Sequence, residues 1–269
     1  MHEREAERLG LRYLYMPIDL DQLDLPPDYL VGMIKYARLL GFRGLNVTHP
    51  CKQAVLEHLD DVAPEAAAIG AVNSVVFRSG RAVGHNTDAY GFEQSLLRGL
   101  PGASLERVVV LGAGGAGSAV AHTLLGLDAR QVVVVDPDES RLEKLVESLR
   151  RRFHFARFAV AAPDDLPRCL GDATGMVNAT PVGMAAHPGM PLAAALLRGD
   201  LWVADIVYLP LETALLRAAR QVGCRTLDGG GMAVFQAAAA FELFTGLSPD
   251  SVRMLEHFAE LARVSRKGV

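Results

Sequence analysis

Two short polar segments carry the residue types that acid–base chemistry on a hydroxyl group requires. The first is Asn46-Val-Thr-His-Pro-Cys-Lys52, and the second is Gly84-His-Asn-Thr-Asp88. An enzyme that oxidises an alcohol by hydride transfer needs a group that accepts the hydroxyl proton, and a lysine oriented by a carboxylate can do this near neutral pH. Lys52 and Asp88 are therefore a candidate pair. From the residues alone, an exposed lysine at a helix start and an aspartate that caps a helix remain open as alternatives.

A third segment has the glycine spacing of a phosphate-binding turn. Gly112-Ala-Gly-Gly-Ala-Gly117 fits the pattern G-x-G-x-x-G between an apolar strand and a helix. In this pattern Gly112 permits a tight turn, Gly114 lets the backbone approach a pyrophosphate, and Gly117 allows the helix to pack closely on the strand. Free N–H groups at the start of the helix favour phosphate binding. The segment predicts a dinucleotide site.

Asp136 predicts which dinucleotide is bound. It lies 19 residues beyond Gly117, directly after the next apolar strand. A carboxylate there can accept hydrogen bonds from the adenosine ribose hydroxyls and repels a 2′-phosphate, so we expect NAD rather than NADP. Two alternatives remain open. Asp136 is also placed to cap a helix ahead of Pro137, and Arg141 is placed to bind a phosphate, which keeps NADP possible.

The elements that must position these residues follow two patterns. Up to residue 100 we expect strands at 11–18, 44–47, 72–77 and 81–84, and helices at 27–40, from about 52, and from 88 towards 97. After Pro101-Gly102, strands at 108–111, 132–135, 155–160, 175–178, 201–205 and 225–227 alternate with helices such as 116–125 and 139–149. Apolar runs of this kind are typical of parallel strands covered on both faces. Two further helices, split by Gly246 and Pro249, complete the chain.

The sequence therefore predicts an α/β protein with a Rossmann-type, doubly wound parallel sheet and a smaller α/β substrate domain. Its 269 residues agree with two domains at about 150 residues each. We expect residues 1–100 and 229–269 to form a discontinuous substrate-binding and catalytic domain. Residues 101–228 are expected to form the dinucleotide-binding domain.

Composition excludes several functional classes. Apolar residues make up 50% of the chain, and a formal net charge of −4 argues against nucleic-acid and membrane-surface partners. Cys51, Cys169 and Cys224 are odd in number and lack metal-ligand spacing, so we expect no disulfide scaffold and no metal. Residues 108–127 carry no charge, but their five glycines indicate a phosphate-binding turn rather than a membrane span. A cytoplasmic protein is the simplest interpretation.

Six motifs, in this order, resemble the shikimate dehydrogenase family. They are Asn46-Val-Thr-His-Pro-Cys-Lys52, Gly70-Ala-Val-Asn73, Asn86-Thr-Asp88, Gly112-Ala-Gly-Gly-Ala-Gly117, Asn178-Ala-Thr-Pro-Val-Gly-Met184, and Asp228-Gly-Gly-Gly-Met232 followed by Gln236. The match extends over nearly the whole chain. His49-Pro50 and Asp136 look most like the NAD-dependent quinate/shikimate dehydrogenases. NADP-dependent biosynthetic members usually have an Asn-Arg-Thr signature where this chain has Asp136-Pro137-Asp138.

The resemblance implies reversible hydride transfer between NAD and a ring hydroxyl of shikimate or quinate. The oxidised forms would be 3-dehydroshikimate and 3-dehydroquinate, in aromatic amino acid biosynthesis or quinate catabolism. An NADP-dependent biosynthetic shikimate dehydrogenase is the alternative, as is a catalytically silent relative that only binds a dinucleotide. Besides a small hydroxy acid and the cofactor, the resemblance implies no partner other than a second copy in a homodimer; a monomer is equally expected.

The resemblance also implies a role for each matching residue. Lys52 would be the acid/base on the reacting hydroxyl, and Asp88 would hold it in place. The residues expected to bind the substrate are Thr48, Asn73, Tyr208 and Gln236. Those expected to bind or adjoin the cofactor are Gly112, Ala113, Gly114, Gly115, Ala116, Gly117, Asp136, Asn178, Thr180, Met184, Gly229 and Met232.

The chain departs from the family at its start. Met1-His2-Glu3 matches a signature that in the family follows a strand and a Ser-x-Ser/Thr-Pro loop, whose hydroxyls bind the substrate carboxylate. We find neither at the matching position. A start codon placed too late is the favoured explanation, because loss of a strand would expose apolar surface and an unpaired sheet edge. A genuine short form with weakened acid binding is the alternative.

Overall fold

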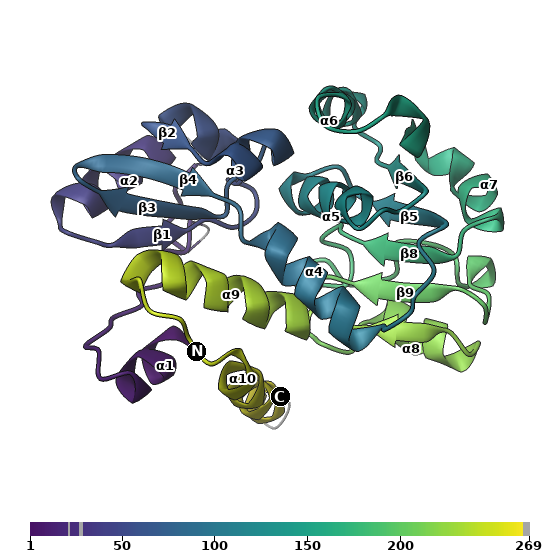
Figure 1. Cartoon of the computed structure of the whole chain (residues 1–269). Helices are drawn as coiled ribbons and strands as arrows, with labels where there is room; N and C mark the ends of the chain where they lie inside the picture. Colours follow the sequence, from purple (N-terminus) through teal and green to yellow (C-terminus); the bar gives the residue numbers. More distant parts are fainter. Residues whose placement is uncertain (21, 27–28, 266–269) are drawn as a thin grey trace. The chain divides into compact units, whose positions relative to one another are not determined.

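The computed structural model describes residues 1–20, 22–26 and 29–265, with side chains of the last helix up to Arg263. The chain forms two compact units, whose elements are labelled in Figure 1. The smaller unit contains Met1–Thr87 and Val234–Val269, and the larger unit contains Asp88–Ala233. The functional domain boundaries at 100/101 and 228/229 stay a prediction.

The larger unit is built on six parallel strands in the order β10-β9-β8-β5-β6-β7. The strands are β5 (Arg107–Leu111), β6 (Gln131–Val135), β7 (Phe158–Ala161), β8 (Gly175–Asn178), β9 (Trp202–Asp205) and β10 (Arg225–Leu227). The helices are α4 (Asp88–Gly99), α5 (Gly115–Gly126), α6 (Glu139–Arg150), α7 (Leu166–Gly171) and α8 (Ala214–Gln221), with short 3₁₀ turns at Phe155–Arg157, Pro163–Asp165 and Ala194–Leu196.

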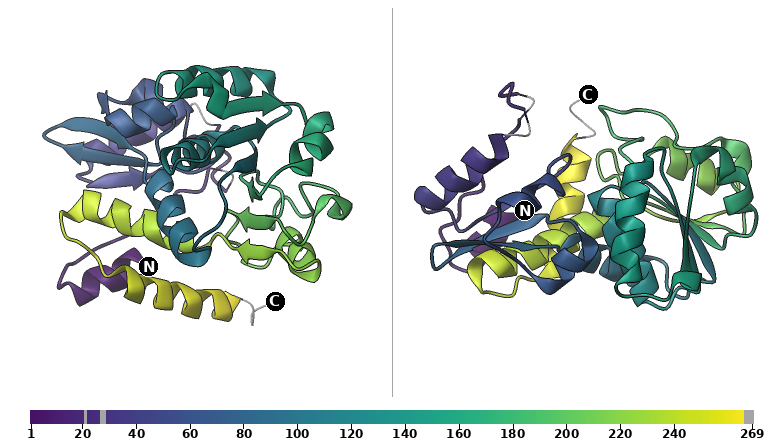
Figure 2. Two further views of the ribbon diagram at one scale, coloured as in Figure 1. Left: turned by 45° about the vertical axis from the view of Figure 1, so that its right-hand side comes forward. Right: turned by 90° about the horizontal axis from the view of Figure 1, so that it is seen from above.

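Alternate residues of the central strand β5 pack on opposite faces of this sheet. Val108 and Val110 lie in one core with buried residues of α4, α5 and α6. Val109 and Leu111 lie in a second core with buried residues of α7 and α8. Helices therefore cover both faces, as Figure 2 shows for the same elements. A strand that is buried on both sides has to be apolar throughout, which explains the unbroken valine runs and confirms the predicted fold class.

The smaller unit contains a mixed sheet of four strands in the order β1-β3-β4-β2. Its elements are α1 (His2–Arg8), α2 (Leu30–Leu39), β1 (Gly44–Asn46), a 3₁₀ helix (Ala54–His58), β2 (Asp61–Val62), α3 (Pro64–Ile69), β3 (Ser74–Arg78), β4 (Arg81–His85) and α10 (Ser251–Ser265). α9 (Gly230–Thr245) begins in the larger unit and continues here. β3 and β4 form the predicted hairpin, in which Ser79 and Gly80 have φ values of 51° and 74°.

Four expected elements differ in the structure. The strand expected at 155–160 begins at Phe158, because the His154 side chain caps a 3₁₀ turn at Phe155–Arg157 by accepting the Ala156 N–H. The strand at 11–18 is wrong, because residues 11–19 have no regular structure and no strand pairs with them. The helix from about 52 is reduced to a turn and the 3₁₀ helix from Ala54, because the Lys52 carbonyl accepts the N–H of Val72 at 2.8 Å instead of closing a helical turn. The helix at 27–40 begins at Leu30, and its expected start at Pro27 lies outside the described residues.

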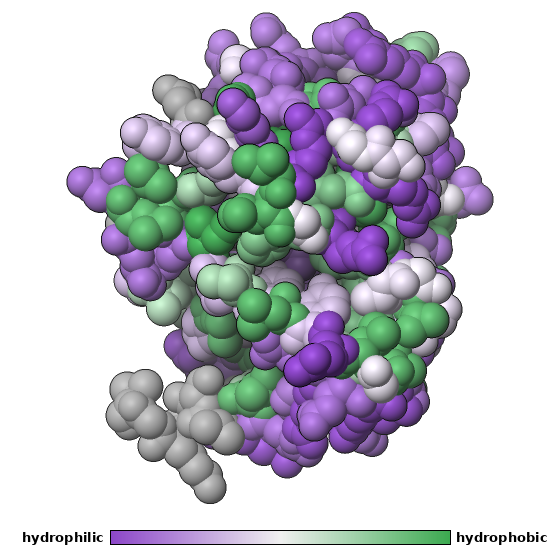
Figure 3. Space-filling model, turned by 90° about the vertical axis from the view of Figure 1, so that its left-hand side faces the viewer, coloured by the Kyte–Doolittle hydropathy of each residue, from purple (hydrophilic) through white to green (hydrophobic). Residues whose placement is uncertain are grey.

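The free edge of β1 lies in a part of the chain that is rich in exposed apolar side chains. β1 pairs only with β3 among the described strands. Leu14, Leu39 and Leu40 expose 74%, 76% and 73% of their surface, and Met16 is also exposed. Figure 3 shows hydrophobic residues gathered at the surface on this side. Residues 14–18 are exposed and pair with none of the described strands, so they lack the cross-strand hydrogen bonds that a strand requires.

A buried ion pair holds the first helix against the last one. The Glu5 side chain is 2% exposed, and its Oε1 accepts from Arg253 Nη2 at 2.6 Å and from the N–H of Asp250 at 2.9 Å. These contacts join α1 to the start of α10. None of the described helices combines the length and the apolar composition of a membrane-spanning segment.

His122 gives the larger unit a pH-dependent stability. The side chain is buried between α5 and α6, its Nε2 lies 2.6 Å from Ser148 Oγ, and burial lowers its pKa from 6.5 to about 4. The unfolded chain therefore binds a proton near pH 6.5 that the folded chain does not bind until about pH 4. We expect the free energy of unfolding to fall by about 3 kcal/mol through this window as the pH is lowered.

Urea unfolding can be followed through Trp202, the single tryptophan, which is buried in β9. His122→Gln should remove about 3 kcal/mol of the pH dependence of the unfolding free energy between pH 6.5 and 4. Burial also lowers the pKa of His2, in the smaller unit, to about 4, and the pH dependence that His2 contributes should remain. The exposed His187→Gln serves as the control and should leave that dependence unchanged. An identical pH profile for His122→Gln and the wild type would contradict the prediction.

Candidate active site

The glycine-rich turn joins β5 to α5 in the larger unit. Gly112 has φ +98°, a conformation that favours glycine, and its N–H donates to Val135 O at 2.8 Å. A Cβ on Gly117 would overlap the Gly112 carbonyl oxygen, so helix and turn approach too closely for any other residue. Gly114 is the N-cap of α5 and supplies no side chain to the first N–H groups, which therefore remain available to an anion. These features fit a dinucleotide pyrophosphate.

The Asp136 carboxylate ties the end of β6 to this turn. Asp136 is 5% exposed, and its Oδ2 accepts from the Ala113 N–H at 2.7 Å. Its Oδ1 accepts from the Asp138 N–H at 2.8 Å. The cap of α6 is Asp138, which accepts from the Arg141 N–H at 3.2 Å. The alternative that Asp136 caps this helix is therefore wrong, because Asp138 occupies that position.

Arg141 is already engaged by a carboxylate. Its Nε lies 3.2 Å from Asp138 Oδ2 in a half-exposed pair. The Arg141 N–H also holds the pKa of Asp138 below its usual range. A phosphate at this corner of the sheet would meet two aspartates, Asp136 and Asp138, together with one cation that is partly neutralised.

Asn178 and Asp205 form a buried polar junction at the ends of β8 and β9. Asn178 Nδ2 donates to Asp205 Oδ1 at 3.0 Å, and Asn178 Oδ1 accepts from the N–H of Thr180 at 3.1 Å. Asp205 Oδ2 accepts from Thr213 Oγ1 at 2.7 Å, and its Oδ1 accepts from the Val207 N–H at 3.1 Å. Burial raises the pKa of Asp205, and the three hydrogen bonds oppose this rise. The junction fixes the two loops that follow these strands.

Those loops carry further predicted residues. Met184 and Tyr208 expose 40% and 44% of their surface. Met184 also lines a cavity of about 380 Å³ that the segments 183–189 and 209–217 enclose within the larger unit. Gly229 lies so close to the Ile206 carbonyl that a Cβ would overlap its oxygen, and Met232 is buried in the core beneath α4 and α5.

Asp205 was not among the residues predicted from the sequence. The available signal was its position at the end of an apolar strand, close to the position that drew attention to Asp136 directly after β6. Asp228, which follows β10, is a second example, since its Oδ1 accepts from the Gly230 N–H at 2.9 Å.

The substrate residues predicted in the smaller unit fall into one hydrogen-bonded group and one loop. Asn73 Nδ2 donates to Thr87 Oγ1 at 2.9 Å, and the Thr87 N–H donates to Asn73 Oδ1 at 2.8 Å. Thr87 Oγ1 lies 3.5 Å from Gln236 Oε1 in α9. Thr48 is exposed and Lys52 is half-buried in the loop after β1. Sequence reasoning placed Thr87 in a motif but missed that it joins Asn73 to Gln236.

The two predicted catalytic residues belong to different units. Lys52 lies in the smaller unit, while Asp88 is the first residue of α4 in the larger unit and is 4% exposed. Asp88 directly follows Thr87, so its backbone continues from the Asn73–Thr87 pair.

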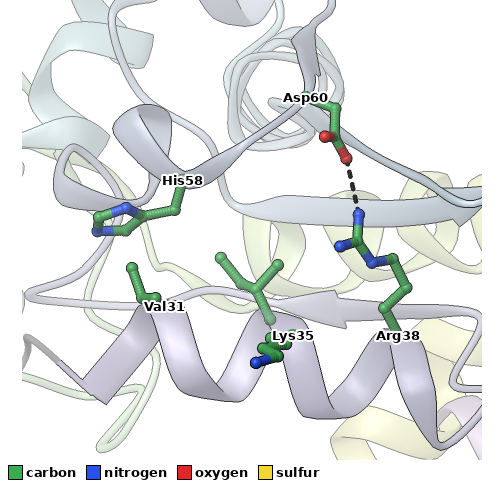
Figure 4. A pocket seen from close by; sticks show the side chains of 6 residues that line it. Val31, Lys35, Arg38, His58 and Asp60 are labelled. Carbon is green, nitrogen blue, oxygen red and sulfur yellow. Dashed lines mark hydrogen bonds and ion pairs between the residues drawn. The ribbon is translucent and has the colours of Figure 1, made fainter.

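A separate cavity of about 230 Å³ lies between α2 and the segment 58–60 (Figure 4), and none of the predicted residues lines it. Its basic lining includes Lys35, Arg38 and His58. Arg38 Nη1, however, is bound to Asp60 Oδ2 at 3.0 Å and to Gly80 O at 3.1 Å. The guanidinium therefore holds two loops together, and we assign no chemistry to this cavity.

Two family models match the chain. One, described as "Shikimate dehydrogenase substrate binding domain", matches residues 1–75. The other, described as "Saccharopine dehydrogenase NADP binding domain", matches residues 108–187. The first lies within the smaller unit and the second within the larger unit.

Curated relatives and a solved structure match nearly the whole chain. A protein named Shikimate dehydrogenase (NADP(+)) from Streptomyces avermitilis is 63% identical over 262 residues, which are 97% of this chain and 90% of the relative. A Quinate/shikimate dehydrogenase (NAD(+)) from Corynebacterium glutamicum is 46% identical over 97% of this chain and 93% of the relative. The structure of a quinate dehydrogenase from Corynebacterium glutamicum in complex with NAD has a TM-score of 0.86 and 43% identity, with 96% and 92% of the two chains covered.

The close approach of Gly117 to Gly112 can be tested by one methyl group. Gly117→Ala should force the turn and the helix apart, at about 1–3 kcal/mol of unfolding free energy, and weaken dinucleotide binding at least tenfold. The control is Gly126→Ala at the other end of α5, where an added Cβ meets nothing within 4 Å. Calorimetric titration with NADP and NAD, beside urea unfolding, measures both effects. Unchanged affinity and stability in Gly117→Ala would be incompatible with this geometry.

Proposed function

Because the chain belongs to the shikimate dehydrogenase family, we propose that it oxidises shikimate reversibly at a ring hydroxyl, with NADP as the hydride acceptor. The observation that carries the proposal is 63% identity, over 97% of the chain, to a relative named as an NADP-dependent shikimate dehydrogenase. The uncapped start of α5 behind a glycine turn supports the dinucleotide part of the proposal.

The proposed reaction removes a hydride from the carbinol carbon and a proton from its hydroxyl. The bound dinucleotide would supply the hydride acceptor at its nicotinamide ring. Lys52 takes the hydroxyl proton during oxidation and returns it to the carbonyl oxygen during reduction. Asp88 holds the lysine ammonium in place as a buried carboxylate. The balance is one alcohol converted to one ketone, one hydride transferred and one proton released.

Four further residues are proposed to hold the substrate. Thr48, Asn73 and Gln236 hydrogen-bond the ring hydroxyls, and Tyr208 contacts the substrate from the loop after β9. Asn73 is suited to this because the Thr87 N–H and hydroxyl fix both ends of its amide. A fixed polar group that loses its partner is left unpaired, which lets a site reject analogues without the matching hydroxyl.

The remaining proposed residues near the cofactor lie in the larger unit. The segment from Gly112 to Gly117 would hold the pyrophosphate, and Asp136 would adjoin the adenosine ribose. Asn178, Thr180, Met184, Gly229 and Met232 would adjoin the nicotinamide end. Support comes from the rigid junction of Asn178 and Asp205, which fixes the loop that carries Thr180.

A second candidate is NAD-dependent oxidation of quinate and shikimate, which the sequence predicted first. One specific observation favours it: Asp136 and Asp138 place two carboxylates where a 2′-phosphate would bind, and Arg141 is paired with one of them. The relative named as NAD-dependent, however, is 46% identical, against 63% for the relative named as NADP-dependent. We therefore place NADP first and make the cofactor the first measurement.

Initial rates measured from absorbance at the reduced nicotinamide band distinguish the two candidates. The proposal predicts that kcat/KM with shikimate is at least tenfold higher with NADP than with NAD, and higher for shikimate than for quinate. A preference for NAD with quinate turnover would replace the first candidate by the second. Dinucleotide binding without turnover of either acid would instead identify a catalytically silent member.

Lys52→Met tests the acid–base role. Loss of a general base lowers a rate by about 10²–10⁴-fold, so kcat should fall by that factor while dinucleotide affinity stays the same. Lys35→Met, which removes an exposed lysine of α2, is the matched control and should retain full activity. Full activity in Lys52→Met would refute the proposed mechanism.

A further inference from the structure

Ser74 occupies a buried position between two amide side chains. It is the first residue of β3 and is completely buried. Its Oγ lies 3.2 Å from Asn46 Oδ1 and 3.2 Å from Asn73 Oδ1. Asn46 ends β1 and is the register partner of Ser74, so the two side chains lie on the same face of the sheet.

These contacts extend into a continuous line of hydrogen bonds. At one end, Asn46 Nδ2 donates to the Tyr15 hydroxyl at 2.9 Å. At the other end, Asn73 Nδ2 donates to Thr87 Oγ1, which lies 3.5 Å from Gln236 Oε1. The line therefore connects five parts of the smaller unit. They are the irregular segment before α2, the end of β1, the start of β3, the loop that follows β4, and α9. All of these residues belong to the smaller unit.

A serine hydroxyl carries one proton, and here two amide oxygens compete for it. Asn73 Oδ1 also receives the Thr87 N–H at 2.8 Å, so it keeps a donor without Ser74. For Asn46 Oδ1, Ser74 is the donor that the structure provides. The Tyr15 hydroxyl can donate or accept and therefore does not by itself decide which end of the Asn46 amide faces it. Removing the Ser74 hydroxyl leaves the orientation of Asn46 weakly determined.

We propose that Ser74 is a positioning residue for substrate binding, which aligns the Asn46 amide with Asn73 through its shared proton. Asn46 lies two residues before Thr48 and opens the loop that carries Lys52. The inference rests on the proposed function, because it takes Asn73 and this loop to face the substrate. Ser74 itself is fully buried and acts only through its two neighbours.

The test compares Michaelis constants rather than stability alone. Loss of one buried hydrogen bond corresponds to about fivefold, so Ser74→Ala should raise KM for shikimate by about fivefold or more. Because Ser74 does not touch the reacting groups or the larger unit's glycine turn, kcat and KM for the dinucleotide should stay within about twofold. Ser74→Thr keeps the hydroxyl and should restore KM for shikimate. A general loss of packing would instead change both Michaelis constants and kcat together.

Two control variants isolate the role of this hydroxyl. Ser95→Ala removes the hydroxyl of a serine in α4 that is 3% exposed. This variant should leave KM for shikimate unchanged. Tyr15→Phe removes the outer end of the line, where the side chain is 40% exposed and water can replace the hydroxyl, so its effect should be smaller than twofold.

The possible failures are distinguishable. If the wild type turns over shikimate normally and Ser74→Ala has an unchanged KM for shikimate, the positioning role of Ser74 is wrong while the proposed function stands. An equal rise of KM in Tyr15→Phe would also overturn it, because the effect would then belong to the irregular segment. If the wild type neither turns over shikimate nor binds it in a calorimetric titration, the proposed function fails and the role of Ser74 fails with it.

Discussion

The structure depends on one repeated interaction, a short acidic or amide side chain at the end of a strand that accepts the backbone N–H two residues further on. Four strands of the parallel sheet end in this way, and the four acceptor–donor pairs are Asp136–Asp138, Asn178–Thr180, Asp205–Val207 and Asp228–Gly230. Such a turn satisfies the first free N–H of the loop and sets its direction. Because all strands of a parallel sheet point the same way, the turns lie at one edge, where loops of α/β proteins bind ligands.

In the smaller unit, too, a buried side chain accepts the N–H of a loop residue, but the two residues are farther apart in the sequence. There Asn73 accepts the N–H of Thr87, which lies 14 residues along the chain, and Ser74 extends the contact to β1. Buried polar groups of this kind are unfavourable unless they are paired, and burial raises the pKa of the Asp205 carboxyl in the larger unit for the same reason. Conformations in which these side chains lose their hydrogen bonds are therefore disfavoured.

Much of the larger unit could be predicted from the sequence, because its strands are buried on both faces and their apolar runs are local signals. The expected strand at 175–178 agrees with β8 residue for residue. The expected strand at 11–18 failed because strand formation needs a partner, which no local pattern reports. The helix expected from about 52 failed for a related reason, since Val72 takes the Lys52 carbonyl. Asp205 and Ser74 escaped notice because their contacts, Thr213 and Asn46, are distant in sequence.

The proposed reaction requires that a hydride passes directly from the substrate carbon to a bound dinucleotide. Shikimate that carries deuterium on the carbon bearing the reacting hydroxyl allows this transfer to be followed. After incubation of the protein with this substrate and NADP or NAD, mass spectrometry of the reduced dinucleotide measures the label. We expect one deuterium in each reduced dinucleotide, together with a slowed hydride-transfer step. Reduced dinucleotide without the label, or no reduced dinucleotide with either cofactor, would contradict it.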